Sequence, residues 1–319
     1  MTKKTPWIPE RDKERLQRSL ANRRGRKNPA RVPNKLTRTS AFAPKNRDLI
    51  TDSNFERLYI IPGHSAIWIQ GRELGTKHRD ALYAVFRLTP EFIKDGISWN
   101  FETRTTWRDL LRLSEVSPHK KNVRTLLETF KDLQKVIIQE VFGDPQQILE
   151  SVQKGNIGGP GYSKPIIDGI SWDGDTLDSA VVISYGKSVR DAFTTRHLVS
   201  LNAEVQFRLS SDYAKSFWPF IDSQPNNNFV TEEVLAQLVD VSLWEDQPME
   251  NNKVRKASHI RADFRRFCKK AFEDMVKAGG LKTWSVDTTG TGHKKSRIYH
   301  YTHALPRQLE LTLDCETTH

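Results

Sequence analysis

The sequence predicts an α+β fold in which one order of helices and strands occurs twice, after a basic N-terminal arm. Two observations carry this prediction. Helices at amphipathic spacing are followed by strand-like segments in two successive parts of the chain. The 319 residues, 37% of them hydrophobic, are enough to bury two cores at roughly 100–200 residues each. We therefore divide the chain into an arm at 1–48, a first domain at 49–204 and a second domain at 205–319.

The arm holds the whole formal net charge of the protein. Residues 1–48 contain 15 Lys and Arg and four acids, a net charge of +11, which equals that of the full chain. The arm also has five prolines and few large apolar residues. Such a segment cannot bury enough surface to offset its ordering entropy, so we expect it to be largely disordered. It could attract phosphates without sequence preference, or it could be a solubilising tail or an uncleaved leader.

The first copy of the repeated order is predicted between residues 79 and 185. Its helices are expected at 79–88, 106–113 and from 117 onward. Its strands are expected at 98–101, 136–142, 166–172 and 179–185. Thr106 and Ser117 are the expected N-caps, because their hydroxyls can accept bonds from backbone N–H groups of the first helical turn.

The second copy is more compact. Its helices are expected at 211–221, 231–240 and 253–278, and its strands at 281–287 and 294–303. Thr231 is the expected cap of the second helix, and Gly279 and Gly280 end the third. Three helices followed by a two-stranded hairpin is the order of a winged helix, whose last helix can enter the major groove of DNA. The sequence therefore predicts tandem winged-helix domains.

The helix at 253–278 separates into two faces at 100° per residue. The core face is predicted to hold Ile260, Phe264, Phe267, Ala271 and Met275, with Cys268 beside them. The opposite face and its flanks are predicted to bind DNA through Lys253, Arg255, Lys256, Ser258, His259, Arg261, Ala262, Arg265, Arg266 and Lys269, and Lys270 also flanks this face. From 253 to 270 there are eight Lys and Arg and one acid, Asp263, a net charge of +7. A merely solvated face, the alternative, usually mixes charges for i,i+4 pairing.

Within this face the early positions, from Arg255 to Ala262, are expected nearest the base edges. Arg266 and Lys269 are expected to hold phosphates. Lys294, Lys295 and Arg297 in the returning strand are expected to contact phosphates as a wing.

The third helix of the first copy has a basic start of its own. His119, Lys120, Lys121 and Arg124 lie in its first turns and are further candidates for DNA contact. A helix start at a dimer or domain interface is the alternative for these four residues.

Other classes of protein find little support in the sequence. It has no apolar run of about 18 residues and no apolar leader, so we expect a cytoplasmic protein that does not span a membrane. Two cysteines, Cys268 and Cys315, fit a reducing compartment. The glycine-rich segment at 155–164 lacks the Gly-Lys-Ser/Thr ending of a phosphate loop and is expected to be a flexible loop. No catalytic constellation emerges, so we expect no enzyme activity, no cofactor and no metal.

Several stretches resemble the iteron-binding plasmid replication initiators of the TrfA and RepA type. They are Gly-Arg-Glu-Leu at 71–74 and the segments 184–196, 207–214 and 253–287. The resemblance implies a protein that binds direct repeats in double-stranded origin DNA, helps to melt the origin, and recruits the host initiator and helicase. It further implies that the second winged helix is the main reader, that the first contributes to dimerisation, and that monomers and dimers are in equilibrium.

Three points stay open at this stage. A winged-helix transcriptional repressor would be built from the same modules, and a non-specific DNA- or RNA-binding protein could act through the arm alone. Gln308–Leu311 resembles the short peptides that dock on a bacterial sliding clamp. The alternation of Leu309, Leu311 and Leu313 is equally compatible with a final edge strand.

Overall fold

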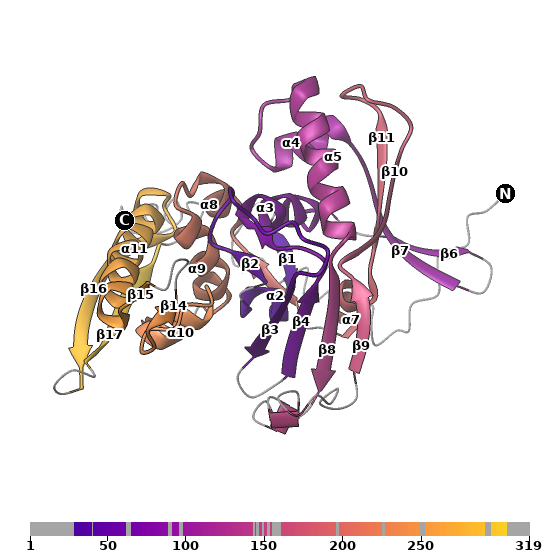
Figure 1. Ribbon diagram of the computed structural model, residues 1–319. Coiled ribbons are helices and arrows are strands. Elements are labelled where there is room, and N and C mark those ends of the chain that lie inside the picture. The colour runs from indigo at the N-terminus through magenta and orange to yellow at the C-terminus, as the bar shows by residue number, and fades with distance from the viewer. Residues whose placement is uncertain are drawn as a thin grey trace, which may run out of the picture.

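The computed structural model describes residues 29–304, with gaps at 40, 62–64, 89–90, 96–97, 143, 145–146, 149, 152–153, 155–160, 196–197, 225–226, 249–252 and 291–294. The described residues form two main hydrophobic cores. One runs from Ala30 to Ala203 and the other from Val205 to Tyr301. Figure 1 shows the two parts side by side, the first in indigo to pink and the second in orange to yellow. None of the helices in the described part is long and apolar enough to cross a bilayer.

The second part is a winged helix, as predicted. Its elements are α9 (Asp212–Ser223), β13 (Phe229–Thr231), α10 (Glu232–Gln237), α11 (Ala257–Lys277), β16 (Leu281–Thr289) and β17 (Ser296–His303). The sheet order is β13-β17-β16, antiparallel throughout. Two short strands, β14 (Gln247–Pro248) and β15 (Val254–Arg255), pair within the α10–α11 connection. The helix α8 (Ala203–Arg208) leads into this domain.

The first part repeats the same order of elements. They are α3 (Thr76–Val85), β7 (Ser98–Thr106), α4 (Trp107–Leu113), α5 (Lys120–Gln134), β10 (Ile167–Trp172) and β11 (Ala180–Tyr185). The strand β11 lies between β10 and β7, just as β17 lies between β16 and β13. An extra edge strand, β6 (Glu91–Asp95), extends this sheet beyond β7. The prediction of an α+β protein with tandem winged helices is therefore confirmed.

The first domain carries a second antiparallel sheet that the repeated order did not predict. Its strands are β3 (Glu56–Ile61), β4 (Ser65–Gln70), β8 (Ile137–Phe142) and β9 (Gly161–Pro165), in the order β3-β4-β8-β9. The strands β8 and β9 are inserted between α5 and β10. Residues 161–164, which we expected in a flexible loop, belong to β9, because their backbone pairs with β8. Residues 155–160 of that segment lie outside the described residues.

The predicted extent of the basic arm is wrong. Its last third folds into the first domain as β1 (Ala30–Pro33), α2 (Asn34–Thr37) and β2 (Phe42–Ala43). The strand β1 pairs with β12 (Leu198–Leu201), which follows α7 (Lys187–Thr195), and β2 pairs with β5 (Leu74–Gly75). Ala30, Val32 and Phe42 are fully buried, so a few apolar side chains at the right spacing outweigh the surrounding charge. Residues 1–28 lie outside the described residues.

Most predicted helix ends are confirmed. The Thr106 hydroxyl accepts a bond from the Asp109 amide, and the Thr231 hydroxyl accepts one from Val234. Gly279, with a φ of +77°, follows the end of α11.

Three predicted helix starts are wrong. The helix α3 begins at Thr76 rather than 79, and two other helices begin later than predicted. The cap of α5 is His119, whose Nδ1 accepts from the Lys121 amide at 3.1 Å, rather than Ser117. The helix α11 begins at Ala257 rather than 253, because Val254 and Arg255 pair with β14 instead.

Candidate nucleic-acid interface

The inner face of α11 fixes its rotation in the second domain. Ile260, Phe264, Cys268, Ala271 and Met275 are buried, as predicted. Phe267 is not: its side chain is 36% exposed, and its ring stacks on Tyr213 with centroids 4.7 Å apart. Phe272 takes the core place instead, stacked at 5.1 Å on Tyr299 of the returning strand. The sheet β16–β17 covers the Phe272 side of the helix and so turns Phe267 outward.

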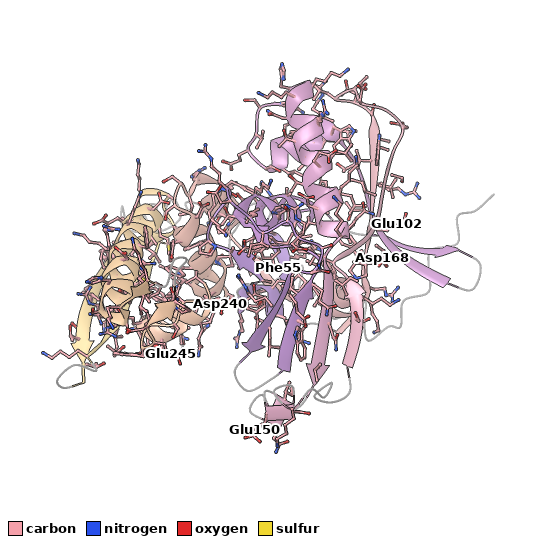
Figure 2. All side chains as sticks on the ribbon, viewed as in Figure 1. Phe55, Glu102, Glu150, Asp168, Asp240 and Glu245 are labelled. Carbon is pink, nitrogen blue, oxygen red and sulfur yellow. The ribbon has the colours of Figure 1, made fainter. Side chains whose placement is uncertain are left out.

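The outer face of α11 is exposed and nearly free of acids. Its exposed residues are Ser258, His259, Ala262, Arg266, Lys269 and Lys270. Ser258 and Ala262 are small and occupy one ridge, so another molecule can approach the helix backbone closely there. Figure 2 shows side chains projecting around the second domain, with nitrogen-tipped ones among them. The predicted face is therefore presented to solvent in one piece.

Two arginines of this face share one carboxylate. Arg255 Nη2 bonds Asp263 Oδ2, and Arg266 Nη2 donates to Asp263 Oδ1 at 2.8 Å. Asp263 is the sole acid between residues 253 and 270. Its side chain is 35% exposed, and that of Arg266 is 72% exposed. The carboxylate therefore holds both guanidinium groups near the surface without covering them.

Arg265 has structural partners inside the second domain. Its Nε and Nη2 donate to Glu232 Oε1 and Oε2 at 2.6 and 2.8 Å, and Nη2 also donates to the Lys295 carbonyl at 2.9 Å. The Glu232 side chain is 0% exposed. The hydrogen bonds to Glu232 are the largest cause of a raised pKa at Arg265. The side chain thus joins α11 to α10 and to the wing.

The connection between α10 and α11 is anchored to the start of α11. Asp246 Oδ1 accepts from the Ala257 amide at 2.8 Å, and Asp246 Oδ2 accepts from Lys256 Nζ at 2.9 Å. These bonds, the one to the Ala257 amide first, lower the pKa of Asp246. Arg261 donates to the Leu243 carbonyl at 2.9 Å and lies 4.7 Å from the centre of the Trp244 ring. Asp246 therefore supplies the cap that Lys256, at the N-cap position, does not.

The remaining predicted DNA contacts belong to the segment just before α11, to the wing and to the start of α5. Lys253 and Lys295 are exposed, Arg297 is half-buried on β17, and Lys294 lies outside the described residues. His119, Lys120, Lys121 and Arg124 are exposed at the start of α5. Lys120 pairs with Asp175 at 2.8 Å. Because α5 packs in the first core and α11 in the second, the structure gives two separate basic helix starts rather than one site.

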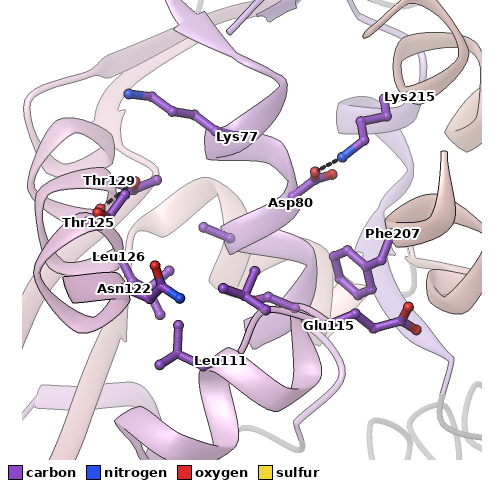
Figure 3. A pocket seen from close by; sticks show the side chains of 13 residues that line it. Lys77, Asp80, Leu111, Glu115, Asn122, Thr125, Leu126, Thr129, Phe207 and Lys215 are labelled. Atoms are coloured by element: carbon purple, nitrogen blue, oxygen red, sulfur yellow. Dashed lines mark hydrogen bonds and ion pairs between the residues drawn. The ribbon is translucent and has the colours of Figure 1, made fainter. Parts of the chain in front are cut away.

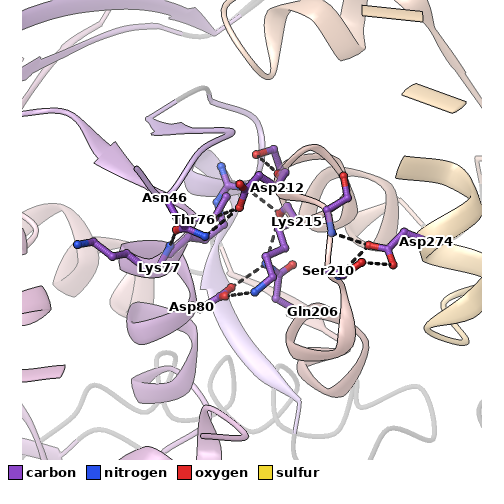
Figure 4. Close-up of polar contacts among 12 residues, drawn as sticks. Asn46, Thr76, Lys77, Asp80, Gln206, Ser210, Asp212, Lys215 and Asp274 are labelled. Carbon is purple, nitrogen blue, oxygen red and sulfur yellow. Dashed lines mark hydrogen bonds and ion pairs between the residues drawn. The ribbon is translucent and has the colours of Figure 1, made fainter. Parts of the chain in front are cut away.

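A polar network between the domains was not foreseen from the sequence (Figure 4). Asp212 of α9 accepts from Thr76 Oγ1 at 2.5 Å, and Lys215 of α9 pairs with Asp80 of α3. The fully buried Arg79 donates to the Lys215 carbonyl at 2.8 Å and to the Phe42 carbonyl at 3.1 Å. These bonds fix α9 against α3, so the two winged helices are held in one arrangement.

Beside this network lies a cavity of about 290 Å³ (Figure 3). Its apolar lining includes Leu111, Leu126 and Phe207, and Lys77 and Glu115 also line it. Lys215 and Asp80, which pair in the network, line its other side. The cavity therefore lies where the first domain meets α8 and α9, away from the outer face of α11. The described part of the chain contains no group of three potential metal ligands.

Comparison with known proteins places the fold. No protein-family model and no curated protein matches the sequence. The solved structure of domains 2 and 3 of RctB is similar, with a TM-score of 0.53 and 11% identity, over 85% of this chain and 98% of that one. The Pi initiator protein in complex with iteron DNA gives a TM-score of 0.49 and 13% identity, over 72% of this chain and 90% of that one. The likeness to RctB spans both winged helices and shows a shared tandem fold.

Proposed function

We propose that the protein is a sequence-specific DNA-binding replication initiator that reads direct repeats in double-stranded origin DNA through α11. The observation that carries the proposal is the outer face of α11, which combines small and basic residues on the third helix of a winged helix, with Asp263 as the one acid between residues 253 and 270. The tandem fold shared with RctB domains 2 and 3 and the sequence resemblance to plasmid initiators point the same way.

The geometry suggests which residues of this face contact bases and which contact phosphates. Ser258, His259 and Ala262 let the N-terminal half of α11 approach base edges, and Arg255 can bond guanine through two donors. Lys269 and the wing residue Lys295 are exposed where phosphates would pass, and such contacts position the protein without reading sequence. Arg261 and Arg265 hold the helix in place in the unbound protein.

Further steps belong to the same proposal and rest on the family resemblance. The bound protein would help to melt an adjacent segment and recruit the host initiator, the helicase and, through Gln308–Leu311, the sliding clamp. His119, Lys120, Lys121 and Arg124 would add a second DNA contact from α5. We further propose that it works in the cytoplasm, without catalytic chemistry, and in equilibrium between monomer and dimer. Residues 305–319, including that peptide, lie outside the described residues.

The first test separates reading by the folded domains from attraction by the arm. Removal of residues 1–28 should leave the preference for directly repeated sites in a gel-shift assay, with weaker binding to all DNA. A cut at residue 48 is unsuitable, because it would delete β1 and β2, whose side chains are buried. Loss of all specific binding on removal of 1–28 would contradict the proposal and favour an arm-based binder.

A second test works at single residues. Arg255→Ala should weaken specific binding by roughly 1–3 kcal/mol and relax one base position, whereas Lys295→Ala should weaken binding to all sequences and reduce the salt slope by about one. Lys277→Ala, an exposed lysine at the far end of α11, is the matched control. If Arg255→Ala lowers specific and non-specific binding equally, Arg255 does not read a base.

A plasmid assay separates initiation from repression. The gene supplied in trans should maintain a plasmid that carries the repeats found upstream of it. If the protein binds those repeats but does not maintain the plasmid, a winged-helix repressor explains the structure better.

A further inference from the structure

The contact among Arg255, Asp263 and Arg266 has a geometry suited to reading two bases together. Asp263 accepts one bond from each arginine, on different oxygens, and in each case from Nη2. A guanidinium group has five N–H donors, so each arginine keeps donors for another partner. Because both nitrogens bond one carboxylate, they lie within roughly 7 Å of each other, about two base-pair steps at 3.4 Å per step.

The position of Asp263 argues for a role in recognition rather than in stability. The side chains of Arg255, Asp263 and Arg266 are 39%, 35% and 72% exposed, so the pairs are too solvated to contribute much to folding. An acid in the middle of a DNA-facing helix repels phosphate and therefore weakens non-specific binding. A gain in the discrimination between bases would offset this cost.

Glu273, the other acid that pairs with a basic residue of the outer face, differs from Asp263 in its partner. Glu273 lies 3.9 Å from Lys269 on α11 and contacts a lysine alone, through a single loose ion pair. A lysine ammonium is a point charge that suits phosphate, whereas two oriented arginines suit the two acceptors on the edge of guanine. Asp263 and Glu273 thus carry the same charge on the same helix but hold different partners, which gives a matched pair for experiment.

We propose that Asp263 is a specificity-determining residue that holds Arg255 and Arg266 as a coupled pair, which reads two guanines no more than about two base pairs apart in each repeat. Arg266 then reads a base instead of holding a phosphate, the role expected from the sequence. The inference rests on the proposed function. The carboxylate fixes the direction of both guanidinium groups and lowers the ordering cost of binding. It also penalises any sequence on which the two arginines contact only phosphate.

The experiment measures binding of the full-length protein to four DNA probes. They are its repeat DNA, two versions of the repeat in each of which one guanine of the proposed pair is replaced, and an unrelated duplex. Asp263→Asn should tighten binding to the unrelated duplex several-fold at low salt. It should lower the discrimination at both guanine positions together, by about tenfold each. Glu273→Gln should tighten binding to all probes by one common factor and leave the discrimination unchanged. Equal thermal midpoints for the three proteins show that folding is intact.

The outcomes separate the inference from the function on which it rests. If the wild-type protein prefers no repeat DNA, the proposed function and the inference both fail. If the wild type prefers the repeats and Asp263→Asn keeps the same discrimination, only the inference fails. If Glu273→Gln lowers discrimination as much as Asp263→Asn does, the effect is one of charge alone and the coupled pair is wrong. Loss of discrimination at both guanines with Asp263→Asn alone supports the proposal.

Discussion

Arg265 offers a direct test of the difference between a structural and a DNA-binding arginine. In Arg265→Met the apolar stem is kept and the guanidinium is lost, which leaves the 0% exposed Glu232 carboxylate without its two bonds from Arg265. Breaking one side of a buried ion pair costs about 3–5 kcal/mol, because a buried charge loses its compensation. The variant should therefore lose a large part of the stability of the second domain.

The double variant Arg265→Met with Glu232→Met supplies the magnitude of the coupling. Removing both charges also removes the cost of burying them, and such replacements are often neutral. The double variant should therefore recover most of the loss. Urea unfolding followed by tryptophan fluorescence measures this, since Trp218 and Trp284 both pack in the second core. We expect a lower midpoint with an unchanged slope for the single variant, and a midpoint near that of the wild type for the double variant.

Binding assays complete the test. If Arg265 acts only through Glu232 and the Lys295 carbonyl, the double variant should bind repeat DNA nearly as well as the wild type. A single variant that unfolds at the wild-type midpoint but fails to bind DNA would refute this reasoning and return Arg265 to the set of DNA contacts.

The remaining predictions concern the first domain. Burial lowers the pKa of His78 from 6.5 to about 4, so between these values the unfolded chain takes up a proton that the folded protein excludes. The free energy of unfolding should therefore fall by about 2 kcal/mol from pH 7 to pH 5. His78→Gln should remove most of this fall, which urea titrations at the two pH values would measure. Gly186→Ala should destabilise the protein by about 2 kcal/mol or more in thermal melts, because a Cβ would lie 1.8 Å from the Pro165 carbonyl oxygen. If the variant melts at the wild-type temperature, β9 can shift to make room and this prediction is wrong. Thr106→Ala should lower the stability by about 1 kcal/mol, because the cap of α4 is lost. Thr106→Ser, which keeps the hydroxyl, should keep most of the wild-type stability in the same melts.

The second domain was predicted well because its helices are amphipathic and its signals are local. The caps at Thr231 and Gly279 depend only on neighbouring residues, and the sequence shows them directly. The exchange of Phe267 for Phe272 in the core could not be predicted in the same way. Both lie near the edge of the apolar stripe, and the choice between them depends on where the distant strands β16 and β17 pack.

The first domain was harder to predict because its organisation is non-local. The strand at 137–142 was recognised, but its partner β4 lies about 70 residues earlier in the chain, and alternation of side chains does not reveal a partner. The strand β1 pairs with β12 across a still longer separation. The charged composition of this segment suggested disorder. Average charge carries no information about tertiary packing, so it does not show that Ala30 and Val32 are buried.

Charge counting along α11 does not show which basic residues have partners inside the protein. The count of +7 between 253 and 270 treats all basic residues alike. In the structure Lys256 is paired with Asp246 and Arg265 with Glu232, and both of these acids lie outside that segment. The structure thus separates basic residues that are tied to acids of the rest of the domain from exposed ones such as Lys269 and Lys270. Residues 1–28 carry ten Lys and Arg against three acids. Under the proposed function, these residues would supply phosphate attraction and α11 would discriminate between sequences.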